Sequence, residues 1–458
     1  HRVGGKFFSQ RGKVSHMIRS AARLARPLAA HARHARSMGD TASERAHLSA
    51  KSKSLMGLED KYGANNYHPL PVVLAKGQGP KVWDVDGKEY YDFLSAYSAV
   101  NQGHCHPKII AAMHEQSTKL TLSSRAFHND VLGEYCEFVT NYFGYERILP
   151  MNTGVEGGET ACKLARRWGY KHKGIPKDKA RILFANENFW GRTLAAISSS
   201  TDPSSYDGFG PMMPGFDLIP FNDLDALDKK LASNASEYAA FMVEPIQGEA
   251  GVVVPQEGYL KKAQEICKKH NVLLIADEVQ TGCSRTGKEL ASMWDGVKPD
   301  VTVLGKALSG GTFPVSAVLA SSEVILGIEP GEHGSTFGGN PLACKIGIAS
   351  LTALREEKMT ENAMKMGELT RKNLHAMNSP LITTIRGRGL LNAIIIKPIE
   401  LKGRTVTAWD VCLELAKNGL LCKPTHDDII RLAPPLVISE AQVNEACGII
   451  EKTLKSFE

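Results

Sequence analysis

Five short apolar runs, each closed by a polar or glycine-containing turn, constrain the fold of this chain more than any other feature of its sequence. The runs are 148–151, 182–185, 241–243, 272–276 and 301–304. The stretches between them carry apolar residues at helical spacing, so predicted strands and helices alternate about every 30 residues. Such alternation builds a mostly parallel sheet with helices on both faces, and ligands bind beyond the carboxyl ends of its strands. The sequence therefore predicts an α/β fold, and the polar residues that end the runs are candidate site residues.

The chain divides into four predicted parts. After about residue 345, amphipathic helices over 343–354 and 361–377 and short strands near 382–385 and 391–396 replace the alternating pattern. A hairpin is predicted around Asp86-Gly87, between two short apolar stretches. The four parts are a basic N-terminal arm (1–45), an N-terminal segment (46–100), a large domain (101–345) and a C-terminal small domain (346–458).

Composition and charge exclude several classes of protein. Apolar residues make up 43% and charged residues 23% of the 458 residues, which excludes disorder over most of the chain. No run approaches the roughly 18 consecutive apolar residues of a spanning helix, so we expect no membrane span. Nine cysteines without a Cys-x-x-Cys pair indicate a reducing compartment. Residues 1–39 hold nine Arg or Lys and no acidic residue, so the rest of the chain has 46 basic and 49 acidic residues. The rest of the chain is therefore slightly acidic, which argues against a nucleic-acid partner.

The first 39 residues have the composition of a targeting segment. Arg19, Arg23, Arg26 and Arg33 recur at helical spacing, although Pro27 would interrupt a helix. An Arg-rich, Ser-containing segment without acidic residues is typical of an organelle transit peptide. We therefore expect a location in the mitochondrial matrix, with the cytoplasm as the alternative. A disordered basic tail, or residues 1–15 added for expression, would also account for the segment.

Asp277 and Lys306 are the most informative pair of residues, because each follows an apolar run. Singly, such residues are more often a helix cap or a solvated surface charge. Together with glycine-rich turns at 154–158 and 334–339, they predict an aldehyde cofactor bound to the Lys306 amine, with the Asp277 carboxylate facing a ring nitrogen. A carboxylate in that place keeps the ring nitrogen protonated. The protonated ring stabilises negative charge on a substrate carbon, which suits amino-group chemistry.

His104, Cys105 and His106 form a cluster of residue types that bind metals. Adjacent residues on an extended chain point to opposite sides, and no second ligand cluster accompanies these three. We therefore predict no metal.

Several longer motifs resemble one enzyme family. The run 274–282 (Leu-Ile-Ala-Asp-Glu-Val-Gln-Thr-Gly), followed by Arg285-Thr-Gly287 and by 300–306, resembles the signature of the class III (subgroup II) pyridoxal-phosphate aminotransferases. Further runs at 66–71, 95–107, 151–156, 189–193 and 334–340 resemble the members of that family that act on ornithine. The resemblance runs from about residue 55 to the C-terminus. It implies fold type I of the PLP-dependent transferases, in which a large domain carries a mostly parallel sheet flanked by helices. A smaller α+β domain comes from the C-terminal part and an N-terminal segment.

The resemblance also implies a set of cofactor-binding residues. They are Gly154 and Val155 at the phosphate, Phe189 stacked on the ring, Asp277 at the ring nitrogen, Gln280 at the ring hydroxyl, Lys306 as the covalent partner and catalytic base, and Ser335 and Thr336 reaching the phosphate from a neighbouring subunit. Because Ser335 and Thr336 would come from a neighbouring subunit, the resemblance implies a homodimer with active sites at its interface. Gly157 departs from the family pattern, which has a small side chain there, and we expect it to loosen the helix start slightly.

The implied substrates are ornithine and 2-oxoglutarate. Tyr67, Tyr97 and Arg192 match positions that hold the far end of ornithine, with Arg192 on its α-carboxylate and Tyr67 near its α-amine, so that the δ-amine lies over the cofactor. Arg431 matches the residue that binds the α-carboxylate of 2-oxoglutarate. Glu249 matches a carboxylate that pairs with Arg431 and swings aside for the keto acid. The products would be glutamate and glutamate 5-semialdehyde, which cyclises to pyrroline-5-carboxylate.

Three other functions remain as alternatives. Another class III enzyme would use acetylornithine, 4-aminobutyrate or a further ω-amine, and Tyr97 argues for ornithine. A catalytically dead scaffold would have no need of Lys306, Asp277 and both arginines. A nicotinamide oxidoreductase would also alternate strands and helices, but no G-x-G-x-x-G closes a first strand in this chain.

Overall fold

The computed structural model describes residues 44–401 and 404–458, which fall into two compact units divided after Val73. The predicted targeting segment lies outside the described residues. In the first unit, α2 (Ala50–Tyr62) begins after Ser49, whose hydroxyl accepts a hydrogen bond from the Ser52 N–H at 3.0 Å. This side-chain cap satisfies a helix-start donor that would otherwise have no partner within the helix.

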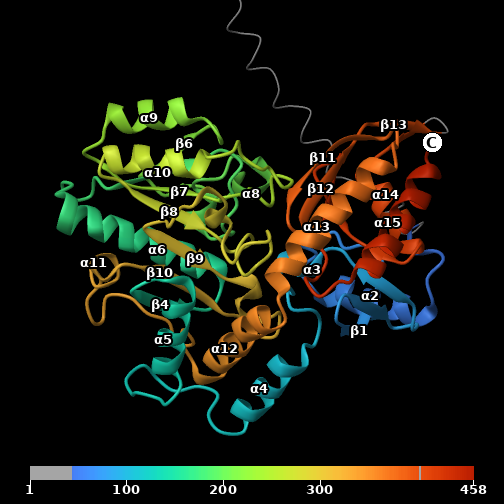
Figure 1. Cartoon of the computed structure of the whole chain (residues 1–458), viewed down its shortest axis with the longest axis horizontal. Helices are drawn as coiled ribbons and strands as arrows, with labels where there is room; N and C mark the ends of the chain where they lie inside the picture. The colour runs from blue at the N-terminus through green and yellow to red at the C-terminus, as the bar shows by residue number, and fades with distance from the viewer. Residues whose placement is uncertain (1–43, 402–403) are drawn as a thin grey trace, which may run out of the picture. The chain divides into compact units, whose positions relative to one another are not determined.

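The second unit, from Leu74 to the C-terminus, contains a seven-stranded sheet in the order β4-β10-β9-β8-β7-β5-β6 (Figure 1). Its strands are β4 (Arg147–Met151), β5 (Arg181–Ala185), β6 (Phe216–Ile219), β7 (Tyr238–Val243), β8 (Leu273–Asp277), β9 (Val301–Leu304) and β10 (Ser316–Ala320). All strands run parallel except β10, which is antiparallel to both neighbours. All five predicted apolar runs are strands of this sheet, and the predicted α/β fold is confirmed.

Alternation along the strands builds a hydrophobic core on each face of this sheet. Ile182 and Phe184 pack with α6 (Gly154–Trp168) on one face, whereas Leu183 between them packs with α9 (Leu224–Ser233) and α10 (Tyr259–Lys269) on the other. Each of these three side chains is at most 1% exposed. The sheet is therefore a rigid layer whose strand ends hold their side chains in fixed positions.

Further helices surround the sheet and connect it to the rest of the second unit. They are α3 (Ser95–Ser98), α4 (Pro107–Ser117), α5 (Leu132–Phe143), η2 (Gly169–Lys173), α7 (Leu194–Ile197), α8 (Pro203–Tyr206), η3 (Ala291–Asp295), η4 (Lys306–Ser309), α11 (Ser322–Ile325) and α12 (Pro341–Glu356). Lys306, the first residue of η4, directly follows the turn after β9.

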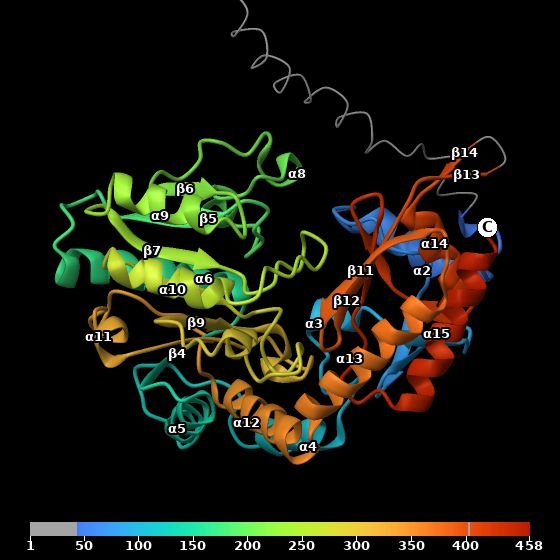
Figure 2. The ribbon, with the colours of Figure 1, turned by 45° about the horizontal axis from the view of Figure 1, so that its top comes forward.

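The C-terminal part forms a separate lobe of the second unit, drawn in orange and red in Figure 2. Its main sheet is antiparallel, in the order β11-β12-β17-β16. The elements are α13 (Met359–Ala376), β11 (Ile382–Arg388), β12 (Leu391–Ile396), β13 (Ile399–Leu401), β14 (Arg404–Val406), α14 (Ala408–Lys417), β15 (Leu420–Leu421), β16 (Lys423–Thr425), β17 (Ile429–Leu432) and α15 (Glu440–Lys455). The predicted amphipathic helices correspond to α12 and α13, and the predicted strands to β11 and β12.

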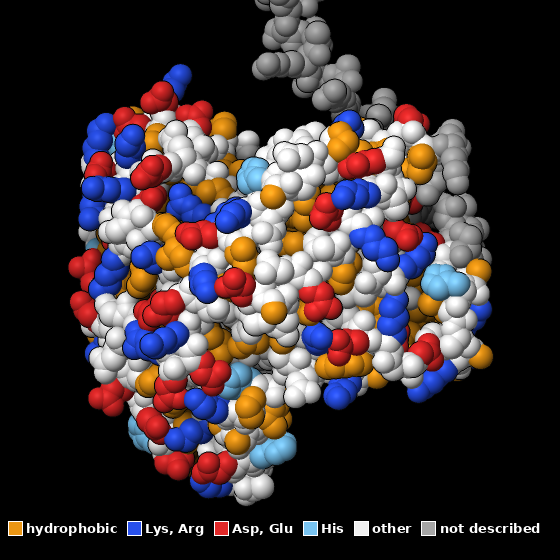
Figure 3. Space-filling model, turned by 45° about the vertical axis from the view of Figure 1, so that its right-hand side comes forward, with side chains coloured by type: hydrophobic (Ala, Val, Ile, Leu, Met, Phe, Trp, Pro, Cys, Tyr) orange, Lys and Arg blue, Asp and Glu red, His pale blue; other side chains and the backbone are white. Residues whose placement is uncertain are grey.

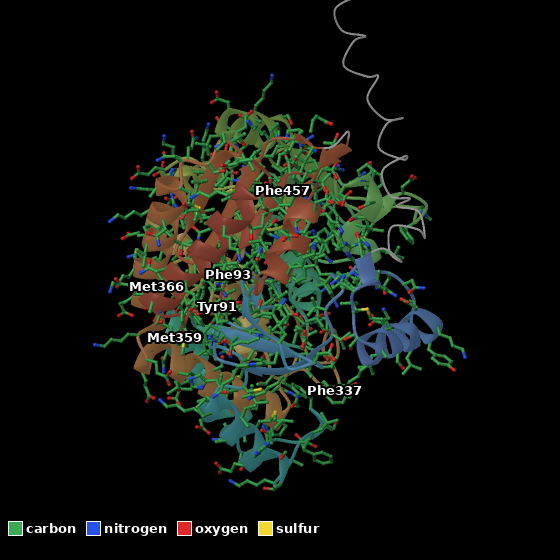
Figure 4. The ribbon with its side chains drawn as sticks, turned by 90° about the vertical axis from the view of Figure 1, so that its right-hand side faces the viewer. Tyr91, Phe93, Phe337, Met359, Met366 and Phe457 are labelled. Carbon is green, nitrogen blue, oxygen red and sulfur yellow. The ribbon has the colours of Figure 1, made fainter. Side chains whose placement is uncertain are left out.

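The predicted hairpin joins this C-terminal lobe. The strands β1 (Leu74–Gln78), β2 (Lys81–Asp84) and β3 (Glu89–Asp92) form a second sheet with β15, which pairs in parallel with β3. Phe93, labelled with Tyr91 in Figure 4, donates its N–H to the Leu421 carbonyl at 2.7 Å and accepts from the Ala433 N–H at 2.8 Å. Segments more than 300 residues apart in the chain are thus hydrogen-bonded neighbours.

Arg285 connects the large sheet's loops to the C-terminal lobe. Its guanidinium is fully buried and donates to the carbonyls of Leu390 at 2.9 Å and Pro434 at 2.6 Å, and to Asn101 Oδ1. A buried cation that satisfies backbone carbonyls of two segments fixes their spacing, because moving either segment would leave the charge without partners.

Three further features concern the thiols, the helices and the surface charges. All nine cysteines are free thiols. None of the helices in the described ranges is both long and apolar enough for a bilayer crossing. Acidic and basic side chains intermingle over the face drawn in Figure 3.

Candidate active site

A cavity of about 220 Å³ lies at the carboxyl ends of β7 and β8 and the start of α6. Its lining comes from the strand-ending turns that the sequence singled out: Gly154, Val155, Phe189, Trp190, Gly191, Glu244, Glu249, Asp277, Val279, Gln280 and Lys306. Strand ends of a parallel sheet meet at one edge, so residues more than 100 positions apart converge there.

Asp277 and Lys306 line the same cavity, where Asp277 is buried and Lys306 is half-buried. Asp277 ends β8, and its carboxylate accepts a hydrogen bond from the Val279 N–H at 3.0 Å. Burial raises the pKa of Asp277 to about 6, against the opposing effect of the Lys306 charge. Burial also lowers the pKa of Lys306, an effect that the nearby Glu249 carboxylate opposes. A buried amine of lowered pKa is neutral more often at physiological pH and can therefore act as a nucleophile or base.

Lys306 also has an unusual backbone. Its φ is 44°, in the left-handed region that side-chain-bearing residues rarely adopt. Such a conformation costs on the order of 1 kcal/mol or more and persists where surrounding structure enforces it, often at functional sites. The turn between β9 and η4 thus holds the Lys306 side chain toward the cavity at the expense of local stability.

The start of α6 provides an anion-binding end to the cavity. Thr153 and Glu156 form a capping box, in which Glu156 Oε2 accepts from the Thr153 N–H at 2.7 Å. Gly154 is the first helical residue, and a β-carbon there would come within 2.8 Å of Val279. The backbone N–H groups of a helix start and its dipole favour negative charge, which suits a phosphate. At Gly157 a β-carbon would lie 2.9 Å from Val303 Cγ1, so this glycine brings α6 close against β9.

Aromatic residues form one wall of the cavity. Phe189 is half-buried, and the Arg192 guanidinium lies over its ring, 5.8 Å from the centroid. Trp190 stacks on Phe184 with ring centroids 5.7 Å apart and donates from Nε1 to Ser199 Oγ at 2.8 Å. Trp190 therefore belongs both to the cavity lining and to the core, while Phe189 offers a ring face to a planar ligand.

Glu244 is a buried carboxylate of the cavity whose role the sequence did not assign. It accepts hydrogen bonds from the N–H groups of Phe189 at 3.0 Å and Gly248 at 3.2 Å, and so fixes both loops. Burial, reinforced by the negative charge of Asp277, raises the pKa of Glu244 to about 8. The sequence feature that could have identified Glu244 as a site residue is its position directly after the predicted strand 241–243.

Glu249, which lines the cavity, forms an ion pair with Arg431. Arg431 Nη1 donates to Glu249 Oε1 at 2.7 Å, and the Arg431 side chain is only 5% exposed. Gln280 Nε2 donates to the same carboxylate oxygen at 3.3 Å. Burial raises the pKa of Glu249, but the positive charges of Arg431 and Lys306 outweigh burial and hold the pKa below its usual value. Glu249 is thus ionised and bound to Arg431 at neutral pH.

Tyr97 lies against the same arginine, with the Arg431 guanidinium 4.7 Å from its ring centroid. It belongs to a turn of four consecutive residues, Ser95 to Ser98, whose φ angles are all between 47° and 69°. A left-handed turn of residues with side chains is strained by roughly 1 kcal/mol per residue. This turn contains no glycine and was therefore not predicted.

Several predicted site residues lie outside the cavity lining: Tyr97, Arg192 and Arg431, which contact lining residues or one another, and Ser335, Thr336 and Tyr67. Ser335 accepts a hydrogen bond from Asn152 Nδ2 at 2.8 Å, and Thr336 is exposed. Tyr67 belongs to the first unit, and its predicted role stays a prediction. His104 and His106 face separate carboxylates, Asp92 at 2.7 Å and Glu357 at 3.2 Å.

Comparison with known proteins identifies the family. The Aminotransferase class-III family model matches residues 62–454. The chain is a class III aminotransferase. It is 60% identical to the mitochondrial ornithine aminotransferase of Drosophila melanogaster over 419 residues, covering 91% of this chain and 95% of that protein.

Solved structures of two other aminotransferases share the fold. The ornithine aminotransferase of Toxoplasma gondii, whose active site holds PLP at partial occupancy, matches with a TM-score of 0.86 and 46% identity over 92% of this chain and 98% of that one. The acetylornithine aminotransferase of Elizabethkingia anophelis matches with a TM-score of 0.80 and 53% identity, covering 89% and 99%.

The residues of the cavity fit PLP, the cofactor of class III aminotransferases. The Lys306 amine suits the aldehyde of PLP, and the Asp277 carboxylate suits its protonated ring nitrogen. The Phe189 ring suits the planar ring of the cofactor, and the start of α6 suits its phosphate. Gln280 Oε1 is buried and has no hydrogen-bond partner among the described residues. A ring hydroxyl would satisfy this acceptor, which supports the same fit.

Proposed function

We propose that this class III aminotransferase transfers the δ-amino group of L-ornithine to 2-oxoglutarate. The products are glutamate and glutamate 5-semialdehyde, which cyclises to pyrroline-5-carboxylate. The observation that carries the proposal is the Arg431–Glu249 ion pair at 2.7 Å, because Glu249 lines the same cavity as Lys306.

The ion pair suits a substrate whose reacting end carries no carboxylate. In ornithine, the carbon that bears the δ-amine is followed by methylene groups, so a free arginine beside it would be a buried charge without a partner. Glu249 neutralises Arg431 during this half of the reaction. At the far end of ornithine, Arg192 then takes the α-carboxylate, Tyr67 lies near the α-amine, and Tyr97 helps to hold the same end.

The keto acid needs the opposite arrangement. The α-carboxylate of 2-oxoglutarate lies next to the reacting carbon and requires a cation there. Arg431 can supply it once Glu249 turns away. Arg431 Nε supports this role, because it is buried and without a hydrogen-bond partner among the described residues.

Lys306 and Asp277 carry the chemistry. Bound PLP supplies an aldehyde and an electron-withdrawing ring that stabilises negative charge on the substrate carbon next to nitrogen. Lys306 Nζ holds the cofactor covalently and then moves a proton from and to the substrate carbon, a role that its lowered pKa favours. Asp277 keeps the ring nitrogen protonated, and Phe189 and Gln280 orient the ring.

The cofactor phosphate links this function to a homodimer. Gly154 and Val155 offer helix-start N–H groups from one subunit, and we propose that Ser335 and Thr336 reach the same phosphate from a second copy. Phe337, labelled in Figure 4, directly follows them in the chain and is 48% exposed. The mitochondrial names of relatives and the basic N-terminal segment support a mitochondrial location.

A substrate comparison tests the proposal. Purified protein is incubated with 2-oxoglutarate and ornithine, acetylornithine or 4-aminobutyrate, and the cyclic product of ornithine is trapped with an aromatic amine. We expect ornithine to give the highest kcat/KM. Preference for acetylornithine, which the likeness to the Elizabethkingia enzyme makes the second candidate, would overturn the substrate assignment.

A further inference from the structure

Four residues form one row across the C-terminal sheet. Arg386 on β11 is the register partner of Ala393 on β12, Ala393 is the partner of Arg431 on β17, and Arg431 is the partner of Lys423 on β16. Directly opposed residues of antiparallel strands point to the same face of a sheet. Three cations therefore share one face with a small alanine among them.

The first cation of the row holds the loop that carries Glu249. Arg386 donates from Nε at 2.9 Å and from Nη2 at 2.7 Å to the carbonyl of Gly251, two residues after Glu249. Gly251 has a φ of 97°, which favours glycine. These bonds restrain the backbone of the loop at that point, so we expect Glu249 to leave Arg431 by rotating its side chain.

The last cation of the row, Lys423, lies on the other side of Arg431. Like charges directly opposite each other on a sheet repel unless a carboxylate compensates. Burial and the charge of Arg431 lower the pKa of Lys423, and Glu249 raises it, so the carboxylate already acts on both cations. A half-buried ammonium one strand away from Arg431 is within the reach of a rotating glutamate side chain.

We propose that Lys423 is the second partner of Glu249. When Arg431 binds the keto acid, the Glu249 carboxylate moves from Arg431 to Lys423. The inference deepens the proposed function and rests on the exchange of Glu249 for a substrate carboxylate. Without such a partner, release of Glu249 from Arg431 would leave a half-buried carboxylate uncompensated, and the keto acid would compete against the full strength of the ion pair. With Lys423 as the second partner, the free energy of the Glu249 carboxylate changes little when it leaves Arg431. Lys423 is therefore a positioning residue.

The test compares Lys423→Met, which keeps the length of the side chain, with Lys423→Arg, which keeps the charge. Glutarate, a dicarboxylate that cannot react, is titrated into the PLP-bound protein by calorimetry. We expect Lys423→Met to weaken glutarate binding about tenfold, the size of one charge-assisted contact, and Lys423→Arg to restore most of it. In half-reactions, the loss with 2-oxoglutarate should be at least several times larger than the loss with ornithine.

A double-mutant cycle with Glu249→Ala separates this role from a direct attraction between Lys423 and the ligand. Once Glu249 is absent, Lys423→Met should weaken glutarate binding no further. An equal loss in both backgrounds would overturn the proposal, and so would full binding by Lys423→Met. Lys397→Met, an exposed lysine after β12, is the matched control. Failure of the parent protein to react with ornithine would refute the proposed function instead, so the two failures are distinguishable.

Discussion

In the proposed reaction, the choice between the two substrates depends on Glu249. It is 28% exposed, whereas its partner Arg431 is 5% exposed, so the carboxylate is the more mobile member of the pair. Replacing the carboxylate leaves a buried arginine facing the methylene groups of ornithine.

We expect Glu249→Ala to lower kcat/KM for ornithine while keeping or improving kcat/KM for glutamate. The ratio of the two constants should fall about tenfold or more, equivalent to roughly 1.4 kcal/mol. Steady-state kinetics with both amino donors measure the ratio. Glu257→Ala, an exposed site on the same stretch of chain, is the control. Equal losses with both donors would contradict the exchange of partners.

Glu244 makes the stability of the cofactor-free protein depend on pH. Its pKa of about 8 in the folded chain is above its ordinary value of 4.5, so the folded state binds this proton more tightly than the unfolded state. The free energy of unfolding therefore falls as pH rises between these two values. Asp277, with a pKa raised to about 6, acts in the same direction at lower pH.

Glu244→Gln should remove the part of this slope that extends above pH 6. We expect the melting temperature of the cofactor-free parent to fall between about pH 6 and about pH 8, and that of the variant to fall less over the same range. Thermal unfolding followed by circular dichroism gives both curves. The slope is the criterion, because glutamine also disturbs the hydrogen bonds to Phe189 and Gly248. Parallel curves would show that Glu244 titrates outside this window.

At the scale of elements, α6 joins the core to the cofactor end of the cavity. Its buried face packs on the sheet, and its first turn presents Gly154 and Val155. Close packing of this helix requires glycine at 158, where a β-carbon would lie 2.6 Å from Trp190 Cε3. The cavity therefore depends on the fit between α6 and Trp190.

Gly158→Ala should destabilise the protein by about 1–3 kcal/mol, as overpacking of a core does, and weaken PLP retention. Gly133→Ala in α5 is the matched control, because a β-carbon there meets no atom within 4 Å. The control should be neutral or stabilise by about 0.5–1 kcal/mol, since alanine is the better helix former. Chemical denaturation measures both. Equal effects of the two changes would show that α6 can shift away from Trp190 without cost.

Sequence patterns predicted the strands and helices that are determined by their own short stretch of residues. Each strand that ends at a candidate residue was a short apolar run, and Asp277 and Lys306 follow from their places in such runs. The strand β10 was not predicted, because its antiparallel pairing with β4 and β9 leaves no mark in its own residues. The cation row across β11 to β16 depends on strand register, and the left-handed turn before Tyr97 contains no glycine. Contacts between distant segments decide these features, and no single stretch of sequence reports them.

At the scale of the whole molecule, the proposed homodimer gives each active site residues from two chains. Thr336 is exposed in one subunit and lies outside the cavity lining of that subunit, so its proposed contact with the phosphate needs a second copy. A site shared in this way can be reassembled from two defective chains.

We expect Lys306→Ala and Thr336→Asp to be inactive or nearly inactive as separate homodimers, the first for want of the amine and the second because its charge repels the phosphate. Mixing and refolding the two variants should restore up to about a quarter of parental activity, because half of the dimers are hybrids with one intact site of two. Turnover and visible absorbance of the mixture measure the recovery. No recovery in mixtures shown to contain hybrid dimers would place Thr336 in its own subunit's site.

The position of β10 has a consequence for synthesis on the ribosome. The strand β4, which leads into the phosphate-binding start of α6, pairs only with β10 in the seven-stranded sheet. Residue 151 emerges long before residue 316, a wait of roughly 10–30 s at ordinary elongation rates. During that time β4 has no partner strand in this sheet, and the start of α6 that follows it is not yet joined to the other strands. We therefore expect the cofactor cavity to be completed only after β10 has been translated, because β10 is the strand that connects β4 to the rest of the sheet.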